Sequence, residues 1–170
     1  MNLTKADLLG RIHKDSLVET IQASDENVGL LLSWSLSTAQ PLGWRSTWIL
    51  KQIIRKNDPR IGLYLSQAID RFSHFNKSQQ REWLKILAHQ KLTEEQEGLL
   101  FDSCIAEWKN LGNQPSLRSS AIEIVFSILK KYPELHHEMV HIMTKEYVET
   151  LSAGIRKGVV KKWESIQGKH

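Results

Sequence analysis

The segment best suited to chemistry is His137-Glu138-Met139-Val140-His141. On a helix, two imidazoles four residues apart can bind zinc while the glutamate activates a water molecule. Leu135, Met139, Ile142 and Met143 form the apolar stripe of the same segment, which turns both histidines toward solvent or a groove. A third ligand has only nominal candidates, Glu146, Glu149 and Glu164. We therefore regard His137 and His141 as weak metal candidates and expect a solvated polar face, with no metal and no cofactor.

Other catalytic arrangements are not indicated by the sequence. The single cysteine, Cys104, follows Phe101 and precedes Trp108 at helical spacing, so we expect a buried small side chain and not a nucleophile. No glycine-rich phosphate loop, paired carboxylates or serine–histidine arrangement stands out. We name no catalytic residue, and the sequence favours a non-enzymatic protein.

The elements that position these residues are predicted to be helices throughout. In residues 44–72, Asp58 followed by Pro59 predicts a capped helix start, so this segment is expected to form two antiparallel helices. Each helix has one apolar face. The first face contains Trp48, Ile49, Ile53 and Ile54, and the second contains Ile61, Leu65, Ala68, Ile69 and Phe72.

This helix pair recurs along the chain. Aligning the first helices on Arg45, Arg81 and Arg118 gives periods of 36 and 37 residues, and second helices are predicted to start at Pro59, about Glu94 and Pro133. These periods are typical of HEAT and armadillo repeats. We expect the arginines to make a repeated structural contact, with a hydrogen bond to a loop or a carboxylate.

The predicted fold is therefore an all-α, right-handed α-α superhelix of the HEAT or armadillo type. We expect a single domain, 1–170, with N-terminal helices in 1–38, helix-pair repeats at 44–74, 77–111 and 115–148, and a capping helix at 150–166. Local signals place the helix ends. They are Thr4 with Asp7, Ser24 with Asn27, Ser78, Thr93 with Gln96, and a left-handed C-cap at Gly112, while the first helices bury Leu8, Leu9, Ile12, Leu17, Val18 and Ile21.

Composition is compatible with such a domain. The 170 residues are 41% hydrophobic and 25% charged, with a formal net charge of +4. One cysteine excludes an internal disulfide, the N-terminus lacks the apolar core of a signal peptide, and no apolar run reaches the roughly 18 residues of a membrane span. We expect a cytoplasmic protein with no membrane association.

Several segments resemble one family closely enough to name it. They are WRSTWIL at 44–50, FDSCIAEW at 101–108, KKYPEL at 130–135 and LSAGIRK at 151–157. Together they are similar to short bacterial HEAT/armadillo-like proteins whose function is uncharacterised. Some members are labelled adenylosuccinate lyases, but this chain is far shorter than such lyases and lacks their catalytic loop. The resemblance implies an α-solenoid and supplies no functional residues.

The predicted function is a scaffold that binds a protein or peptide in its groove. In HEAT stacks the groove is usually lined by the second helix of each pair. Their exposed positions give the predicted binding residues, which are Tyr64, Gln67, Arg71, Lys109, His137, His141 and Lys145. The sequence does not specify the partner or the oligomeric state.

Two alternatives remain open. DNA binding, as in HEAT-like alkylation-repair proteins, would use exposed tryptophans and basic clusters, of which Lys51-Arg55-Lys56-Arg60 and 156–162 are the densest. The spacing predicts burial of Trp48, Trp108 and Trp163, and leaves Trp44 and Trp83 freer. The third possibility is a zinc-dependent hydrolase that uses His137 and His141.

Overall fold

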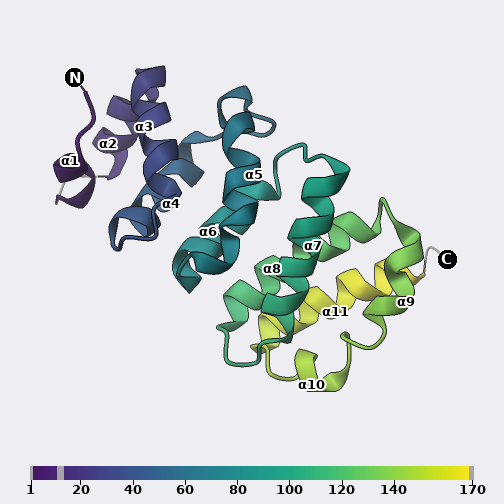
Figure 1. The fold of residues 1–170 in the computed structure, drawn as a ribbon. Coiled ribbons are helices and arrows are strands. Elements are labelled where there is room, and N and C mark those ends of the chain that lie inside the picture. Colours follow the sequence, from purple (N-terminus) through teal and green to yellow (C-terminus); the bar gives the residue numbers. More distant parts are fainter. Residues whose placement is uncertain (1, 11–13, 169–170) are drawn as a thin grey trace. The chain divides into compact units, whose positions relative to one another are not determined.

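The computed structural model describes residues 2–10 and 14–168, and every regular element in these ranges is a helix (Figure 1). The predicted all-α fold is confirmed. The chain divides into two compact units, 1–96 and 97–170, with the boundary in the first turn of a helix at Glu94–Lys109. Ile12, which belongs to the predicted apolar pattern, lies outside the described residues.

Unit 1 contains six α-helices and two short 3-10 helices among its described residues. The predicted second-helix start at Pro59 is confirmed, although its first turn is a 3-10 helix. The elements are α1 (Lys5–Leu9), α2 (Lys14–Gln22), α3 (Asp25–Ser35), α4 (Leu42–Ile53), η1 (Pro59–Ile61), α5 (Gly62–Asp70), η2 (Phe72–His74) and α6 (Lys77–Leu87).

The core of unit 1 forms around α4, which packs most extensively against α3 and α6. Its buried face includes the small residues Gly43, Ser46 and Thr47, and this lets the neighbouring backbones approach closely. A Cβ atom on Gly43 would lie 2.0 Å from the carbonyl oxygen of Ser37, so no larger residue fits there without a shift. The buried face of α4 therefore contains small and polar residues as well as isoleucines.

The carboxyl end of α3 is held by side chains from both neighbours of that helix. The carbonyl oxygen of Ser35 accepts hydrogen bonds from Gln79 Nε2 at 2.8 Å and from Trp83 Nε1 at 3.1 Å. Thr47 Oγ1 donates to the same oxygen at 3.3 Å. Because the last carbonyls of a helix lack intrahelical partners, these contacts stabilise the packing of α3 against α4 and α6.

Unit 2 is built on α8 (Pro115–Leu129), which packs against α11 (Ala153–Gln167), as Figure 1 shows. A helix is thus present where the capping helix was predicted. On its apolar side Val159 and Trp163 are buried and Ile155 is half-buried, and Leu151 is buried just before the helix. The other elements are α7 (Glu94–Lys109), η3 (Pro133–Leu135), α9 (His136–Met139) and α10 (Lys145–Val148).

The predicted second helix of the third repeat, expected as one element up to residue 148, is broken. It consists of η3, α9 and α10, and the segment between Met139 and Lys145 is a turn. Only Met139 of the predicted stripe is fully buried, while Leu135, Ile142 and Met143 are half-buried. The apolar residues here are too few to bury one face of a long helix, and helical stability comes mainly from such packing.

Local capping signals were mostly correct. Thr4 and Asp7 form a capping box, Ser24 accepts from the amide of Asn27, and Thr93 and Gln96 exchange two hydrogen bonds. The prediction of Ser78 as an N-cap was wrong, because Asn76 caps α6 by accepting from the amide of Gln79 at 2.8 Å.

The predicted left-handed cap at Gly112 was also wrong. No described glycine has a positive φ, and the α7 segment ends at Lys109, before Gly112. Asn57, in the loop after α4, is the described non-glycine residue with a positive φ, at 53°. Asparagine tolerates this conformation better than most residues, so the turn after α4 is specified by a side chain that the repeat pattern did not single out.

The aligned arginines make structural contacts, as predicted. Arg45 Nη1 donates to the carbonyl oxygen of Leu9 at 2.7 Å, at the end of α1. Arg118 Nε donates to the carbonyl oxygen of Trp108 at 2.8 Å, in the last turn of α7. Arg81 instead pairs with the buried carboxylate of Glu82. Two of the three arginines therefore satisfy carbonyl groups at helix carboxyl ends, where a cation is favoured.

Candidate functional site

The histidine pair does not form the arrangement that a zinc protease motif requires. His137 lies in α9, but that helix ends at Met139 and His141 lies in the following turn. Both side chains are exposed. No group of three or more potential metal ligands occurs among residues 2–10 and 14–168. The structure thus gives the two imidazoles neither a common helical face nor a third ligand.

The seven predicted groove residues are divided between the two units. Tyr64, Gln67 and Arg71 lie on or directly after α5 in unit 1, with Tyr64 half-buried and the other two exposed. Arg71 also donates to the carbonyl oxygen of Leu36 at 3.1 Å. The other four are exposed residues of unit 2, namely Lys109, His137, His141 and Lys145. None of the seven lines either of the two clefts of unit 1 described below, and their role in binding stays a prediction.

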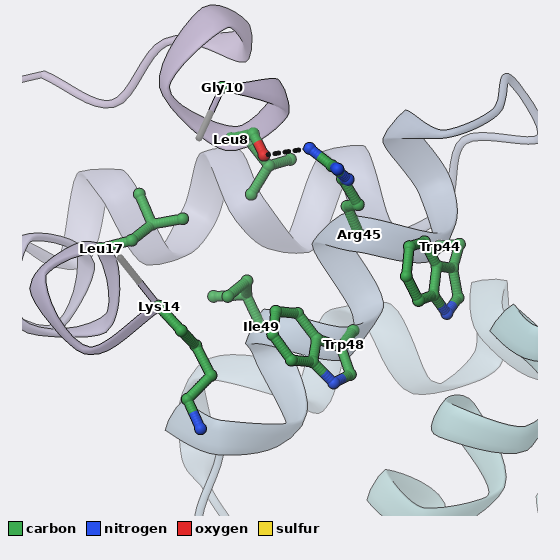
Figure 2. A pocket seen from close by; sticks show the side chains of 8 residues that line it. All are labelled: Leu8, Gly10, Lys14, Leu17, Trp44, Arg45, Trp48 and Ile49. Carbon is green, nitrogen blue, oxygen red and sulfur yellow. Dashed lines mark hydrogen bonds between the residues drawn. The ribbon is translucent and has the colours of Figure 1, made fainter. Parts of the chain in front are cut away.

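A first cleft, of about 250 Å³, opens in unit 1 between α1, α2 and α4 (Figure 2). We call it the tryptophan cleft because Trp44 and Trp48 form part of its wall. Its lining is mainly apolar, and its two charged residues are both cationic. The lining residues are Leu8, Gly10, Lys14, Leu17, Trp44, Arg45, Trp48 and Ile49.

Trp48 was predicted to be buried, and this prediction was wrong. Its side chain is 36% exposed, whereas Trp83, predicted to be freer, is fully buried. The cause is the packing of α4, which buries Ser46, Thr47 and Leu50 and so rotates Trp48 out of the core. Trp108 and Trp163 are buried as predicted.

The exposed Trp48 is held between two neighbours. Its ring stacks on that of Trp44, with centroids 6.4 Å apart and an interplanar angle of 23°. Lys14 Nζ lies 6.0 Å from the ring centroid. Arg45, on the same helix, reaches toward α1 to bond its last carbonyls (Figure 2). The tryptophan cleft is therefore an ordered apolar surface with a positive rim.

A second cleft, of about 590 Å³, lies at the carboxyl ends of α2 and α4. We call it the basic cleft because its three cationic lining residues outnumber its two carboxylates. Residues from α2, α3, α4, the loop after α4 and η1 contribute. They are Gln22, Asp25, Ile53, Arg55, Lys56, Asn57, Asp58, Pro59 and Arg60.

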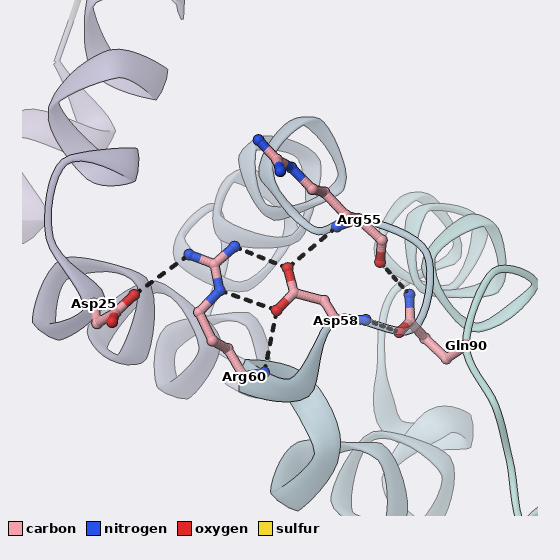
Figure 3. A network of polar contacts seen from close by, with 5 residues as sticks. All are labelled: Asp25, Arg55, Asp58, Arg60 and Gln90. Carbon is pink, nitrogen blue, oxygen red and sulfur yellow. Dashed lines mark hydrogen bonds and ion pairs between the residues drawn. The ribbon is translucent and has the colours of Figure 1, made fainter.

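The carboxylate of Asp58 organises this cleft (Figure 3). It accepts from Arg60 Nε at 3.0 Å and Arg60 Nη2 at 2.8 Å, which is a bidentate pair, and also from the amides of Arg55 and Arg60. The hydrogen bonds and charge of Arg60 lower the pKa of Asp58 to about 2. Arg60 also faces Asp25, at 3.6 Å.

This pKa predicts an acid-labile contribution to stability. Since the pKa of Asp58 is lower in the folded state, its stabilising contribution is complete above the ordinary value of 3.8 and is lost as the pH falls toward 2. We expect Asp58→Asn to lower the free energy of unfolding by roughly 2 kcal/mol at pH 6 and by much less near pH 2. Urea denaturation of both proteins between these pH values measures the difference, and a difference independent of pH would contradict this assignment.

Comparison with known proteins bears on the whole chain. A family model described as a HEAT repeat domain matches residues 4–163. The chain belongs to the HEAT repeat family. Neither the search of curated proteins nor the search of solved structures found a match. The match of the family model confirms the predicted HEAT-like family, and together with the all-helical structure it confirms the predicted α-α superhelix class.

HEAT repeats are helical scaffolds that commonly mediate protein interactions. The two clefts are therefore considered as surfaces for a protein partner. No helix in the described part of the HEAT repeat protein is long and apolar enough to cross a membrane. Both clefts lie in unit 1, and neither is lined by the residues that were predicted to face the groove. The basic cluster Lys51-Arg55-Lys56-Arg60 was the available signal, since three of its four residues line the basic cleft.

Proposed function

We propose that this HEAT repeat protein is a non-enzymatic scaffold that binds a protein partner by taking up an apolar side chain in the tryptophan cleft. The observation that supports this function is the exposure of Trp48, at 36%, on a wall that is otherwise apolar. Tryptophan is among the residues that dominate the binding energy of protein interfaces. The cleft volume of about 250 Å³ is below the roughly 300 Å³ at which small-molecule sites begin, so one side chain suits it better than a cofactor.

The ring geometry favours a protein partner over a nucleic acid. A base stacks on an open aromatic face, and each stacked base contributes about 1 to 3 kcal/mol. Trp48 stacks on Trp44, and Lys14 Nζ lies over its ring. What remains exposed of Trp48 is better suited to contact with an inserted aliphatic or aromatic side chain.

A zinc-dependent hydrolase has less support. Its two histidines are separated by the end of α9, and the described residues include no group of three potential ligands. The chemistry of the donor set, and not the lack of a bound ion, is the reason that we prefer the scaffold.

Selection of peptides tests the proposal without knowledge of the natural partner. Random 12-residue peptides displayed on phage are selected on the HEAT repeat protein, and binding of the winners is measured by fluorescence anisotropy. We expect an apolar anchor in the enriched peptides and a loss of affinity of about 30-fold in Trp48→Ala, which corresponds to a hot spot of about 2 kcal/mol.

Leu63→Ala is the matched control. Leu63 is 87% exposed on α5 and lines neither cleft, so its truncation removes exposed apolar surface elsewhere in unit 1. We expect its affinity for the same peptides to stay within twofold of the unmodified protein. Peptides that bind Trp48→Ala as tightly as the unmodified protein would refute the tryptophan cleft as the binding site.

A further inference from the structure

The tryptophan cleft and the basic cleft are two ends of one surface. Helix α2 contributes Lys14 and Leu17 to the first and Gln22 to the second. Helix α4, which packs against α2, contributes Trp48 to the first and Ile53 to the second. Both clefts therefore lie along the line where α2 meets α4, which we call the α2–α4 seam.

Helices α2 and α4 each carry a row of exposed or half-buried side chains outside the core. On α2 the row is Lys14, Val18 and Gln22, spaced by four residues and exposed or half-buried. On α4 it is Trp44, Trp48 and Gln52, with the same spacing and similar exposure. Residues four apart share one face of a helix, so the α2 row runs from Lys14 at the tryptophan cleft to Gln22 at the basic cleft, and the α4 row begins with Trp44 and Trp48 at the tryptophan cleft.

The charge of the seam is unbalanced. Five cationic side chains line the two clefts, against two carboxylates. Asp58 is already matched by the bidentate pair with Arg60. Arg55 and Lys56 are exposed and, within the part of the chain that the structure describes, neither forms a side-chain ion pair. These two cations remain available to an anionic ligand.

The loop that carries these two cations is held by hydrogen bonds from its backbone to Gln90 and His89, which follow α6. Gln90 Nε2 donates to the carbonyl oxygen of Arg55 at 2.9 Å, and Gln90 Oε1 accepts from the amide of Asp58 at 3.1 Å (Figure 3). The amide of Asn57 donates to the carbonyl oxygen of His89 at 3.0 Å. Because this backbone is already ordered, binding loses little backbone entropy. The conformational entropy lost when a ligand binds Arg55 and Lys56 is mainly that of their side chains.

From these observations, and resting on the proposed function, we infer that the α2–α4 seam binds a segment that is both apolar and acidic. An apolar anchor fills the tryptophan cleft, and acidic side chains meet Arg55 and Lys56 at the basic cleft. From Lys14 to Gln22 the helix rises about 12 Å, at about 1.5 Å per residue. About four residues of an extended chain cover that distance. The acidic residues thus follow or precede the anchor by about four positions.

Matched peptides test the acidic half of this specificity. One apolar peptide from the selection is made in two glutamate forms, with glutamates four and five positions before the anchor in one and after it in the other. Each form has a matched peptide with two glutamines at the same positions. We expect the glutamate form with the better side to bind about tenfold more tightly at low salt, which two exposed ion pairs can supply. In Arg55→Gln, Lys56→Gln the ratio should fall to about one, and in 0.5 M salt it should shrink.

A second variant controls for net charge. Lys157→Gln, Lys161→Gln removes the same charge from exposed positions of α11 that line neither cleft. We expect it to keep the preference for glutamate. An equal loss of preference in both double variants would overturn the assignment to Arg55 and Lys56, because it would show an effect of overall charge.

A direct probe separates failure of this inference from failure of the proposed function. Blocked triglutamate is titrated into the protein, and amide shifts of 54–60 are followed by NMR. Shifts there that vanish in Arg55→Gln, Lys56→Gln support the acidic site, even if Trp48 contributes nothing. If Trp48-dependent peptides show no preference for glutamate and triglutamate leaves 54–60 unshifted, the acidic site is overturned while the scaffold function stands. Stronger, steeply salt-dependent shifts with a 12-residue oligothymidylate would also overturn it, in favour of nucleic acid.

Discussion

Replacing Trp83 with alanine is expected to lower the free energy of unfolding by about 3 to 5 kcal/mol, the usual cost of truncating a large buried aromatic residue. Trp83 is 0% exposed, and its ring stacks on that of Phe75, with centroids 6.4 Å apart. The truncation leaves a cavity within the packing of α4 and α6 and removes one donor to the carbonyl oxygen of Ser35. Urea denaturation followed by circular dichroism measures the change.

Trp83→Phe separates the two causes. Phenylalanine keeps much of the buried apolar volume but cannot donate to Ser35, whose oxygen retains Gln79 and Thr47 as donors. We expect a smaller loss, of about 1 to 2 kcal/mol. A cost below about 1 kcal/mol for Trp83→Ala would contradict the burial of Trp83 between α4 and α6.

The second large effect is expected at Arg118, in unit 2. Arg118→Met should lower the free energy of unfolding by about 3 kcal/mol, because partly buried acceptors lose a charged donor. The side chain is 1% exposed and donates to the carbonyl oxygens of Trp108 and Tyr147 and to Thr150 Oγ1, at 2.8, 2.7 and 2.6 Å. Its guanidinium also lies 4.6 Å from the ring centroid of Trp108. Amide hydrogen exchange within 97–168 reports the loss where it occurs.

Arg118→Lys is the informative companion. A lysine keeps the charge but lacks the planar fork that reaches three acceptors in different directions. We expect it to recover less than half of the stability lost in Arg118→Met. Full recovery would mean that the positive charge at the carboxyl end of α7, and not the set of directed hydrogen bonds, accounts for the effect of this residue.

Much of the fold follows from interactions between residues close in sequence. The capping pair Thr93 with Gln96 and the N-cap at Asp58 involve residues two or three positions apart, so the sequence alone predicts them. The 36- and 37-residue periods predicted a HEAT-like stack for the same reason, since each repeat carries its own helix signals. The arginines that mark the period were also correctly assigned to structural contacts.

The surface of the stack could not be predicted in this way. Binding residues were predicted on the second helices, at Tyr64, Gln67 and Arg71, and these line neither cleft of unit 1. The clefts arise where α2 meets α4, two helices separated by about 20 residues. Whether two packed helices leave a cleft between them depends on the side chains of both helices. The apolar periodicity of one helix does not include that information.

The sequence by itself thus determined the all-α class and most helix starts, because these depend on local hydrogen bonds and on apolar periodicity. The second helix of the third repeat is the exception, since it is broken into short pieces. The tertiary structure decided the buried face where small and polar residues share it, as on α4 and α6. Trp48 and Trp83 exchange their predicted places because Ser46, Thr47 and Gln79 are buried by close helix packing and by hydrogen bonds to distant carbonyls. Hydrophobicity alone cannot identify a face that small and polar residues share, and the exposed tryptophan on which the proposed function rests is the result.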